Sequence, residues 1–315
     1  MKIIIADSLP DSAAALLREQ GWTVDSRTGR PLPELLDDIA DADGLIVRSA
    51  TKVTKEVMKA APQLRIVARA GTGVDNVDLS AADENGVLVV NAPGANSISV
   101  AEHTCALLLA LSRHITVADS QMKRGLWEKK SLQGAELRGK TLGILGLGRI
   151  GCEVARRAAA FEMTVVAHDP FISTQLAGDL AVELLSLDEL RERSDYITLH
   201  IPSTAATAQL IDRDWLTHCK PGVRIVNTAR GDLIDETALL EGLTTNQVAG
   251  AALDVFQVEP PVNEQLIGHP HVVATPHIAA STKEAQELVG VETATCVRDF
   301  LKSGLVRNAV NFPTV

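Results

Sequence analysis

The sequence predicts an α/β protein with two doubly wound parallel sheets. Its length of 315 residues corresponds to roughly two domains. Short apolar runs alternate with helical stretches in two successive series, and apolar strands between helices are typical of a parallel sheet covered on both faces. One apolar run also leads directly into a glycine-rich turn, Gly146–Gly151, which helps to define the second sheet.

The first hundred residues contain the first series. Glycines mark turns between its elements, as at Gly44, Gly71 and Gly86. The alternation indicates a flavodoxin-like sheet. We expect strands at Ile3–Ile5, Leu45–Val47, Leu64–Ala68 and Val87–Val90, with helices at Ser12–Glu19, Thr54–Ala60 and Leu79–Glu84.

A longer helix separates the two series. The segment Ser97–Arg113 begins with a serine and carries a long apolar stripe, which predicts a helix that connects two domains. Six strands are expected beyond it, the number in a full dinucleotide-binding (Rossmann) sheet. They are Leu142–Leu145, Thr164–Ala167, Tyr196–Leu199, Val223–Val226, Ala249–Leu253 and Val272–Ala274, with helices at Ile150–Phe161, Leu187–Arg193, Arg213–His218 and Glu236–Leu243.

The end of the chain is expected to return to the first domain. A final helix, Thr282–Lys302, is followed by a tail that is too short to form a domain. We therefore expect a discontinuous substrate-binding domain of residues 1–97 and 289–315, and a dinucleotide-binding domain of residues 98–288.

Composition argues against several classes of function. Lys and Arg total 30 against 40 Asp and Glu, so the net charge is −10 and a basic face for nucleic acid is not expected. The apolar runs are too short to span a membrane, and the N-terminal segment is unlike a signal peptide, so we expect a cytoplasmic protein. The four cysteines are widely separated, which disfavours disulfides or a metal site.

The segment Gly146–Gly151 fits the pattern G-x-G-x-x-G. It directly follows the apolar run Thr141–Leu145 and opens a helix, and Asp169 stands 18 residues after Gly151, at the end of the next strand. In this layout the glycines permit a tight turn and close approach of the backbone, and the helix N-terminus attracts phosphates. The pattern predicts a dinucleotide-binding turn.

Asp169 is the residue expected to select the cofactor. Its carboxylate can accept hydrogen bonds from two ribose hydroxyls and would repel a 2′-phosphate. The residues that follow, Pro170–Ile172, offer no cation for such a phosphate. We therefore predict NAD rather than NADP.

Candidates for proton transfer and substrate binding follow three strands of the second series. Hydride transfer to a carbonyl requires a nearby proton donor, and His277 follows the strand that ends at Ala274. Arg230 and Glu259 follow the two preceding strands. His200 also ends a strand, where a place near the cofactor and a purely structural one are equally compatible with the sequence, whereas His103 is interpreted as a helix-face or interface residue.

These segments together resemble the signature of the D-isomer-specific 2-hydroxyacid dehydrogenases. The resemblance extends over essentially the whole chain and is greatest to members that act on a phosphorylated 2-hydroxy acid. The segments that carry it are Leu145–Gly151, Asn227–Gly231, Ala251–Pro261 and Pro276–Thr282, with Ala68–Asn76 in the first domain.

The resemblance implies a role for each matched residue. Arg230 would bind the substrate carboxylate, His277 would exchange the proton, and Glu259 would favour the imidazolium form of His277. The implied cofactor contacts are Thr72, Gly146, Gly148, Arg149, Ile150, Gly151, Asp169, Ile201, Thr228, Ala229, Arg230, Asp254, His277 and Ala280.

The first domain is expected to select the substrate. Arg48 and Arg69 end two of its strands, and arginine matches phosphate and carboxylate oxygens with paired hydrogen bonds. The alternative for both arginines is an ion pair with Asp75 or Asp78. The predicted substrate-binding residues are Arg48, Arg69, Gly73, Asn96, Arg230 and His277.

The sequence also indicates an oligomeric state and two alternative functions. The segments Ser97–Arg113 and Gln121–Leu137, which includes Trp127, resemble the dimer-forming region of the family, so a homodimer is expected. The same site could serve a reductase of glyoxylate, hydroxypyruvate or another 2-keto acid. A dinucleotide-sensing binding protein, such as a corepressor built on this fold, is the alternative from another class.

Overall fold

The computed structural model describes residues 1–313, which form two compact units. The first contains Met1–Asn96 and the segment that begins at Ser281, and the second contains Ser97–Ala280. The sequence placed the second boundary later, at residue 289. The structure differs because α13 (Lys283–Ser303) is one continuous helix whose buried residues, from Val289 to Leu301, pack on the sheet of the first unit.

The first unit is built on a five-stranded parallel sheet in the order β2-β1-β3-β4-β5. This order is flavodoxin-like and confirms the fold class that the sequence predicted, although only four of the five strands were expected. The strands are β1 (Lys2–Ile5), β2 (Thr23–Asp25), β3 (Gly44–Val47), β4 (Ile66–Arg69) and β5 (Leu88–Asn91).

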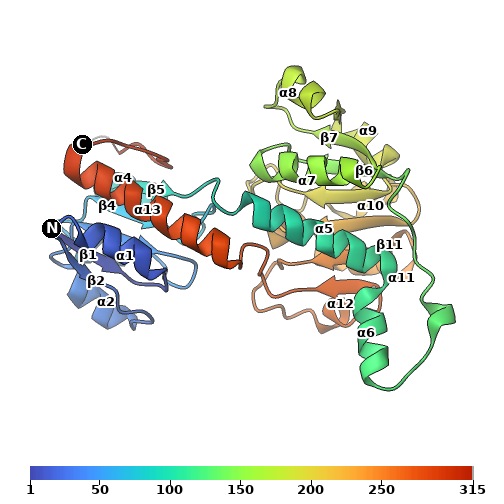
Figure 1. Cartoon of the computed structure of the whole chain (residues 1–315), viewed down its shortest axis with the longest axis horizontal. Helices are drawn as coiled ribbons and strands as arrows, with labels where there is room; N and C mark the ends of the chain where they lie inside the picture. Colours follow the sequence, from blue (N-terminus) through green and yellow to red (C-terminus); the bar gives the residue numbers. More distant parts are fainter. Residues whose placement is uncertain (314–315) are drawn as a thin grey trace. The chain divides into compact units, whose positions relative to one another are not determined.

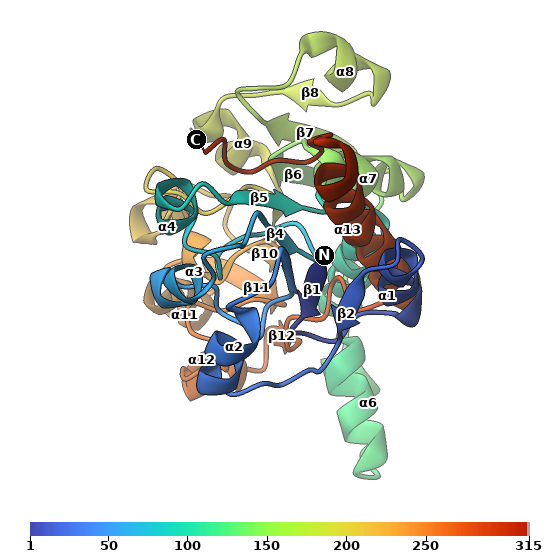
Figure 2. The ribbon, with the colours of Figure 1, turned by 90° about the vertical axis from the view of Figure 1, so that its left-hand side faces the viewer.

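Two helical layers cover this sheet. Alternate residues of each strand face opposite sides, so Ile4 packs with α2–α4 whereas Ile3 and Ile5 pack with α1 and α13. Figure 2 shows α2, α3 and α4 on one side of the sheet and α1 and α13 on the other. The helices are α1 (Asp11–Arg18), α2 (Leu32–Ile39), α3 (Lys55–Ala60) and α4 (Leu79–Glu84), with α13 beside α1 (Figure 1).

The tail after α13 pairs with the edge strand β5. Ala309 forms an antiparallel bridge with Val90, and the amide of Val310 donates to the carbonyl of Val89. The side chain of Asn311 accepts a hydrogen bond from the amide of Val89 at 2.6 Å. Both ends of the described chain therefore belong to the first unit.

The second unit is built on a seven-stranded parallel sheet in the order β12-β11-β10-β9-β6-β7-β8. The order reverses between β6 and β9, and ligands bind at such a reversal in open parallel sheets. The strands are β6 (Thr141–Leu145), β7 (Thr164–His168), β8 (Glu183–Leu184), β9 (Tyr196–Leu199), β10 (Val223–Asn227), β11 (Val248–Leu253) and β12 (Val272–Ala274).

Helices also cover both faces of this sheet. One core joins the strands to α5, α7 and α8, and the other joins them to α9–α12. The helices are α5 (Ser97–Arg113), α6 (Ile115–Lys123), α7 (Arg149–Ala160), α8 (Thr174–Asp179), α9 (Leu187–Arg193), α10 (Arg213–Thr217), α11 (Glu236–Thr244) and α12 (Glu264–Ile267), with 3₁₀ turns at Lys129–Ser131 and Gly231–Leu233.

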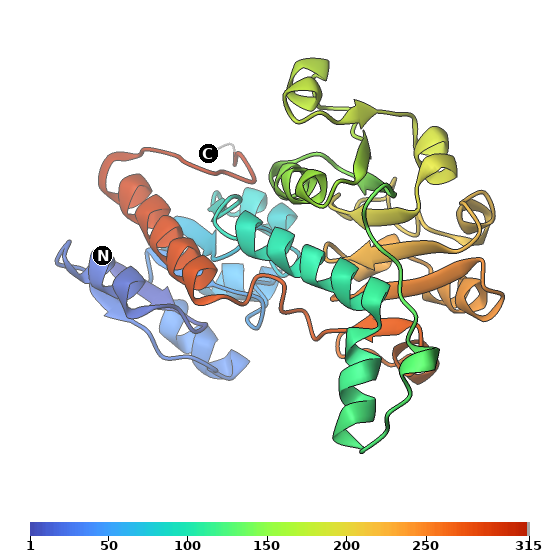
Figure 3. The same cartoon turned by 45° about the vertical axis from the view of Figure 1, so that its right-hand side comes forward.

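Helix α6 and the segment after it project from the rest of the second unit (Figure 3). The chain bends between α5 and α6 at His114, whose φ of 54° is left-handed. None of the residues of α6 is buried. In the described part of the chain, no helix is long and apolar enough to cross a membrane, and no cluster of metal-ligating side chains occurs.

Candidate active site

The glycine-rich turn has the backbone that a dinucleotide pyrophosphate requires. Gly146 has a left-handed φ of 91°, and a Cβ atom on Gly151 would lie 2.1 Å from the carbonyl oxygen of Gly146. Gly148 precedes α7, has open space where a side chain would stand, and makes no side-chain cap. The N–H groups of the first turn of α7, which include those of Arg149 and Ile150, therefore remain available to phosphate oxygens.

Asp169 lies at the carboxyl end of β7, beside this turn. One carboxylate oxygen accepts from the amide of Leu147 at 2.8 Å, and the other accepts from the amide of Phe171 at 2.9 Å. Each oxygen keeps a further lone pair for a ribose hydroxyl. These residues fit a dinucleotide with its ribose at Asp169.

Ile201, a predicted cofactor contact, follows β9 together with His200. The backbone of His200 and the side chain of Ile201 lie next to Gly146, because a Cβ atom on Gly146 would come within 2.6 Å of the His200 carbonyl oxygen and 2.8 Å of Ile201. Burial lowers the pKa of His200 to about 3, so its imidazole is neutral. His200 therefore meets the turn through its backbone, while its neutral ring lies 3.0 Å from the hydroxyl of Thr198.

The turn after β10 carries Arg230. The buried side-chain amide of Asn227 accepts a hydrogen bond from the backbone N–H of Ala229 at 3.0 Å. It donates one to the backbone carbonyl of Arg230 at 2.7 Å. The hydroxyl of Thr228 lies 2.9 Å from that of Thr104 on α5. These contacts hold the backbone of the predicted cofactor-binding and carboxylate-binding residues.

The Arg230 turn also packs against the loop that carries Glu259. A Cβ atom on Gly231 would lie 1.9 Å from the carbonyl carbon of Phe256, so the two backbones touch and only glycine fits. The amide of Phe256 donates to Glu259 Oε1 at 3.2 Å. Glu259 Oε2 lies 2.8 Å from Nδ1 of His277.

The pair of Glu259 and His277 fixes the tautomer of the histidine. An ionised carboxylate can only accept a hydrogen bond, so Nδ1 of His277 carries a proton. Nε2 is then the nitrogen without a proton when the imidazole is neutral. The imidazole is about half exposed, so Nε2 is on an accessible side chain.

The predicted residues of the second unit therefore lie at one edge of its sheet. Arg230, Glu259 and His277 follow the neighbouring parallel strands β10, β11 and β12, whose carboxyl ends share that edge. Asp254 follows β11 and is fully buried, and Ala280 follows the turn after His277.

The predicted residues of the first unit lie at the carboxyl ends of β3, β4 and β5. The hydroxyl of Thr72 donates to the side-chain oxygen of Asn96 at 3.1 Å. The amide of Arg48 donates to the buried carboxylate of Asp7 at 2.5 Å, and its guanidinium donates to the carbonyl of Ser8.

The expected alternative for Arg48 and Arg69 was an ion pair with Asp75 or Asp78. In the structure, the carboxylate of Asp78 accepts a hydrogen bond from the amide of Ala81 as the N-cap of α4. The guanidinium of Arg69 lies against Gly71, where a Cβ atom would come within 1.6 Å of it. Gly73 follows in the same half-buried loop.

Sequence reasoning missed one group of polar contacts. His103 and Thr275, 172 residues apart, form a hydrogen bond of 3.1 Å beside the buried Asp254. The only signal in the sequence was His103 itself, a polar residue within an apolar helix. Such a residue is equally compatible with an interface.

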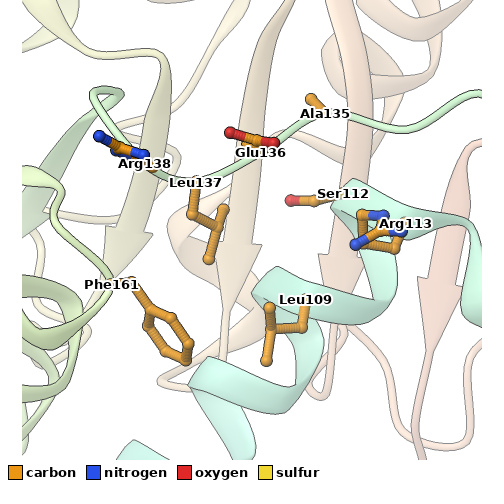
Figure 4. Close-up of a pocket in the computed structure, with 8 residues that line it drawn as sticks. All are labelled: Leu109, Ser112, Arg113, Ala135, Glu136, Leu137, Arg138 and Phe161. Atoms are coloured by element: carbon orange, nitrogen blue, oxygen red, sulfur yellow. The ribbon is translucent and has the colours of Figure 1, made fainter.

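A pocket of about 210 Å³ lies away from this site. Apolar Leu109, Leu137 and Phe161 and charged Arg113 and Arg138 are among the residues that line it (Figure 4). Phe161 directly follows α7 and Arg138 precedes β6, so the pocket lies at the amino edge of the sheet.

The doubly wound sheet and its glycine-rich turn define a dinucleotide-binding α/β protein. The family model of the D-isomer specific 2-hydroxyacid dehydrogenase NAD binding domain matches residues 105–279, which is more than half of the chain. The chain belongs to the D-isomer-specific 2-hydroxyacid dehydrogenase family.

Two relatives that match nearly the whole chain carry the same name. The chain is 47% identical over 316 residues to D-3-phosphoglycerate dehydrogenase of Archaeoglobus fulgidus, covering 100% of this chain and 60% of that one. It is 49% identical over 310 residues to the enzyme of the same name from Rattus norvegicus, covering 98% and 58%. The chain thus spans about three-fifths of the length of these relatives.

A solved structure matches the whole fold. The TT0316 protein of Thermus thermophilus superposes with a TM-score of 0.90 at 36% identity, over 99% of this chain and 100% of that one. A match of this extent includes both parallel sheets.

Proposed function

We propose that this protein is an NAD-dependent D-3-phosphoglycerate dehydrogenase. It would oxidise C2 of D-3-phosphoglycerate to give 3-phosphohydroxypyruvate, the entry step of phosphorylated L-serine biosynthesis. The similarity to enzymes of that name over nearly the whole chain supports the substrate. The observation that carries the chemistry is the 2.8 Å contact between His277 and Glu259 at the edge that also presents Arg230.

His277 acts as the base in oxidation. Its Nδ1 proton is held by Glu259, so Nε2 accepts the proton of the C2 hydroxyl. NAD, when bound, supplies the nicotinamide ring that accepts the hydride from C2. In the reverse direction the imidazolium returns the proton to the carbonyl oxygen, and the negative charge of Glu259 favours that cation.

Arginines bind the two acidic groups of the substrate in this proposal. Arg230 pairs with the carboxylate next to C2, because its guanidinium presents parallel donors. Arg48 and Arg69 bind the C3 phosphate, with Asn96 and the backbone of Gly73 as further donors. The amide of Arg48 is fixed by Asp7, which supports a defined position for this residue.

Turnover assays separate this proposal from its rivals. The protein should reduce NAD with D-3-phosphoglycerate far faster than with D-glycerate or D-lactate. A preference for glyoxylate or hydroxypyruvate with NADH would indicate a reductase instead. Binding of NAD(H) without turnover of any of these acids would indicate a dinucleotide-sensing protein.

The choice of phosphate-binding residue has its own test. Arg48→Ala should lower kcat/KM for D-3-phosphoglycerate much more than for D-glycerate, because only the former carries the C3 phosphate. Lys52→Ala, which removes a nearby exposed cation, is the matched control. Equal losses with both substrates would assign Arg48 to the shared carboxylate or to the fold.

Asp169 is proposed to make the enzyme specific for NAD. Asp169→Ala should raise KM for NAD and narrow the preference for NAD over NADP, because the repulsion of a 2′-phosphate is removed. Equal use of both cofactors by the unmutated protein would contradict this assignment.

We also propose a homodimer that acts in the cytoplasm. Exposed apolar side chains gather on α6 and the segment after it, where Ile115 and Met122 are each 55% and Trp127 is 75% exposed. Such a surface is unusual on a monomer. Light scattering at micromolar concentration should give twice the chain mass, and Trp127→Ala should shift the equilibrium towards monomer.

The four free cysteines are compatible with a reducing compartment, which cell fractionation would test.

A further inference from the structure

His103 on α5 points its ring at the residues that precede the acid–base histidine. Its Nε2 atom lies 3.1 Å from Oγ1 of Thr275 and 3.5 Å from Oδ1 of Asp254. The side chain of His103 is 20% exposed, and Asp254 is fully buried. This group joins α5 to the carboxyl ends of β11 and β12.

The donors and acceptors in this group can be assigned. The hydroxyl of Thr275 donates its single proton to Asp254 Oδ1 at 2.6 Å, so it can only accept from His103. Nε2 of His103 therefore carries a proton and donates it to Thr275. The direction of donation runs from His103 through Thr275 to Asp254.

Asp254 in turn fixes the backbone on which His277 stands. Its carboxylate accepts from the amides of Ile278 and Ala279, both at 2.9 Å, and its carbonyl accepts from the amide of His277 at 2.8 Å. His277 has a left-handed φ of 52°, a conformation that costs a residue other than glycine free energy. The contacts with Asp254 offset this cost.

We propose that His103 is a positioning residue for His277, acting through Thr275 and Asp254. This inference rests on the proposed function, in which His277 exchanges the proton. Loss of the His103 donor frees Thr275 to rotate, and the turn that carries the imidazole then samples positions outside proton-transfer distance.

Hydrogen bonding to Asp254 agrees with this assignment. Burial raises the pKa of Asp254, but nearby His103 and the hydrogen bonds from Thr275 and the amides of Ile278 and Ala279 together leave it below its ordinary value. Asp254 thus stays ionised, as its acceptor role requires.

The test compares two substitutions of His103. His103→Leu removes the donor, and His103→Gln retains an N–H near the place of Nε2. We expect His103→Leu to lower kcat about 10- to 100-fold, as for a displaced catalytic group, with KM for NAD within about twofold. His103→Gln should recover most of kcat. His218→Leu, the same change at the exposed histidine that follows α10, should leave kcat unchanged.

A second variant shows whether the path runs through Thr275. Thr275→Val preserves shape and removes the hydroxyl, so the double variant with His103→Leu should lose no more kcat than the more impaired single variant. Additive losses, an increase in KM for NAD at constant kcat, or failure of His103→Gln to recover activity would overturn the proposal.

The imidazole signal of His277 provides a readout that does not depend on turnover. Its NMR resonance, assigned by its loss in His277→Ala, should shift or broaden in His103→Leu and return in His103→Gln. If the unmutated protein turns over no 2-hydroxy acid, the proposed function fails while this measurement still decides the role of His103. An unchanged resonance would overturn the inference.

Discussion

At the scale of single residues, charge and proton position decide what the site can do. Glu259 holds Nδ1 of His277 at 2.8 Å, which leaves Nε2 to exchange the proton in the proposed reaction. The pair is partly exposed, so solvent screens part of their attraction. Its role is therefore best tested by the pH dependence of catalysis rather than by stability.

Glu259→Gln should move the pH profiles of both directions to lower pH. Glutamine can still accept from Nδ1, but the negative charge that favours the imidazolium is gone. Oxidation, which needs neutral His277, should begin at lower pH. Reduction, which needs the cation, should be lost at lower pH. Steady-state rates across the pH range in both directions measure this, and unchanged profiles would contradict the pairing.

His277→Ala provides the reference for that experiment. Loss of the acid–base group should lower kcat about 100- to 10,000-fold, while calorimetry should find NAD binding nearly unchanged. A comparable loss of NAD affinity would mean that the imidazole serves chiefly to hold the cofactor.

At the scale of elements, local sequence patterns determined most of what could be predicted. The apolar strands and the helices α5 and α7 could be predicted because their apolar periodicity and the turn residues at their ends are visible in the sequence. The sequence missed β2 and β8, because Thr23–Asp25 and Glu183–Leu184 are short edge strands without a buried apolar run. It also missed α2, although its apolar residues Leu35 and Ile39 are buried.

The site shows the same division between local and long-range information. His277, Glu259 and Arg230 could be proposed because each follows a recognisable strand. The contact of His103 with Thr275 could not, because it joins α5 to β12 through the packing of the helix on the sheet. The signal of such a contact is spatial, and neither segment carries a pattern of its own.

Gly151→Ala should weaken NAD binding and destabilise the second unit. The new Cβ atom would lie 2.1 Å from the carbonyl oxygen of Gly146, so the turn or α7 must move. Such overpacking typically costs about 1–3 kcal/mol of unfolding free energy. Isothermal titration with NAD and urea unfolding measure the two effects.

Gly178 provides the matched control for this substitution. It lies in α8 with no atom within 4 Å of a new Cβ. Gly178→Ala should therefore leave NAD affinity unchanged and stabilise the protein by up to about 1 kcal/mol, because alanine favours a helix. Equal effects of the two variants would refute the role of close approach at Gly151.

At the scale of the whole molecule, the first unit depends on residues from both ends of the sequence. α13 packs on α1, and a Cβ atom on Gly290 would come within 2.6 Å of Pro10. The tail then pairs with β5, where residue 311 bonds to residue 89 across 222 positions of sequence. The first sheet therefore cannot reach its native packing until the second unit and α13 have been synthesised.

Asn311→Ala should destabilise the first unit by about 2 kcal/mol, because it leaves the buried amide of Val89 without its acceptor. Asn311 is 6% exposed and also donates to the carboxylate of Asp83 at 2.9 Å and to the carbonyl of Val87 at 3.0 Å. Hydrogen exchange followed by mass spectrometry should show that the variant exchanges faster in β5 than the unmutated protein does. Exchange in the strands of the second unit should stay the same. Phe312→Ala, at an 81% exposed neighbour, should change stability by less than about 0.5 kcal/mol. If both variants left exchange in β5 unchanged, the tail would be dispensable for the first sheet, and the stability of that sheet would come from α13 and the N-terminal strands alone.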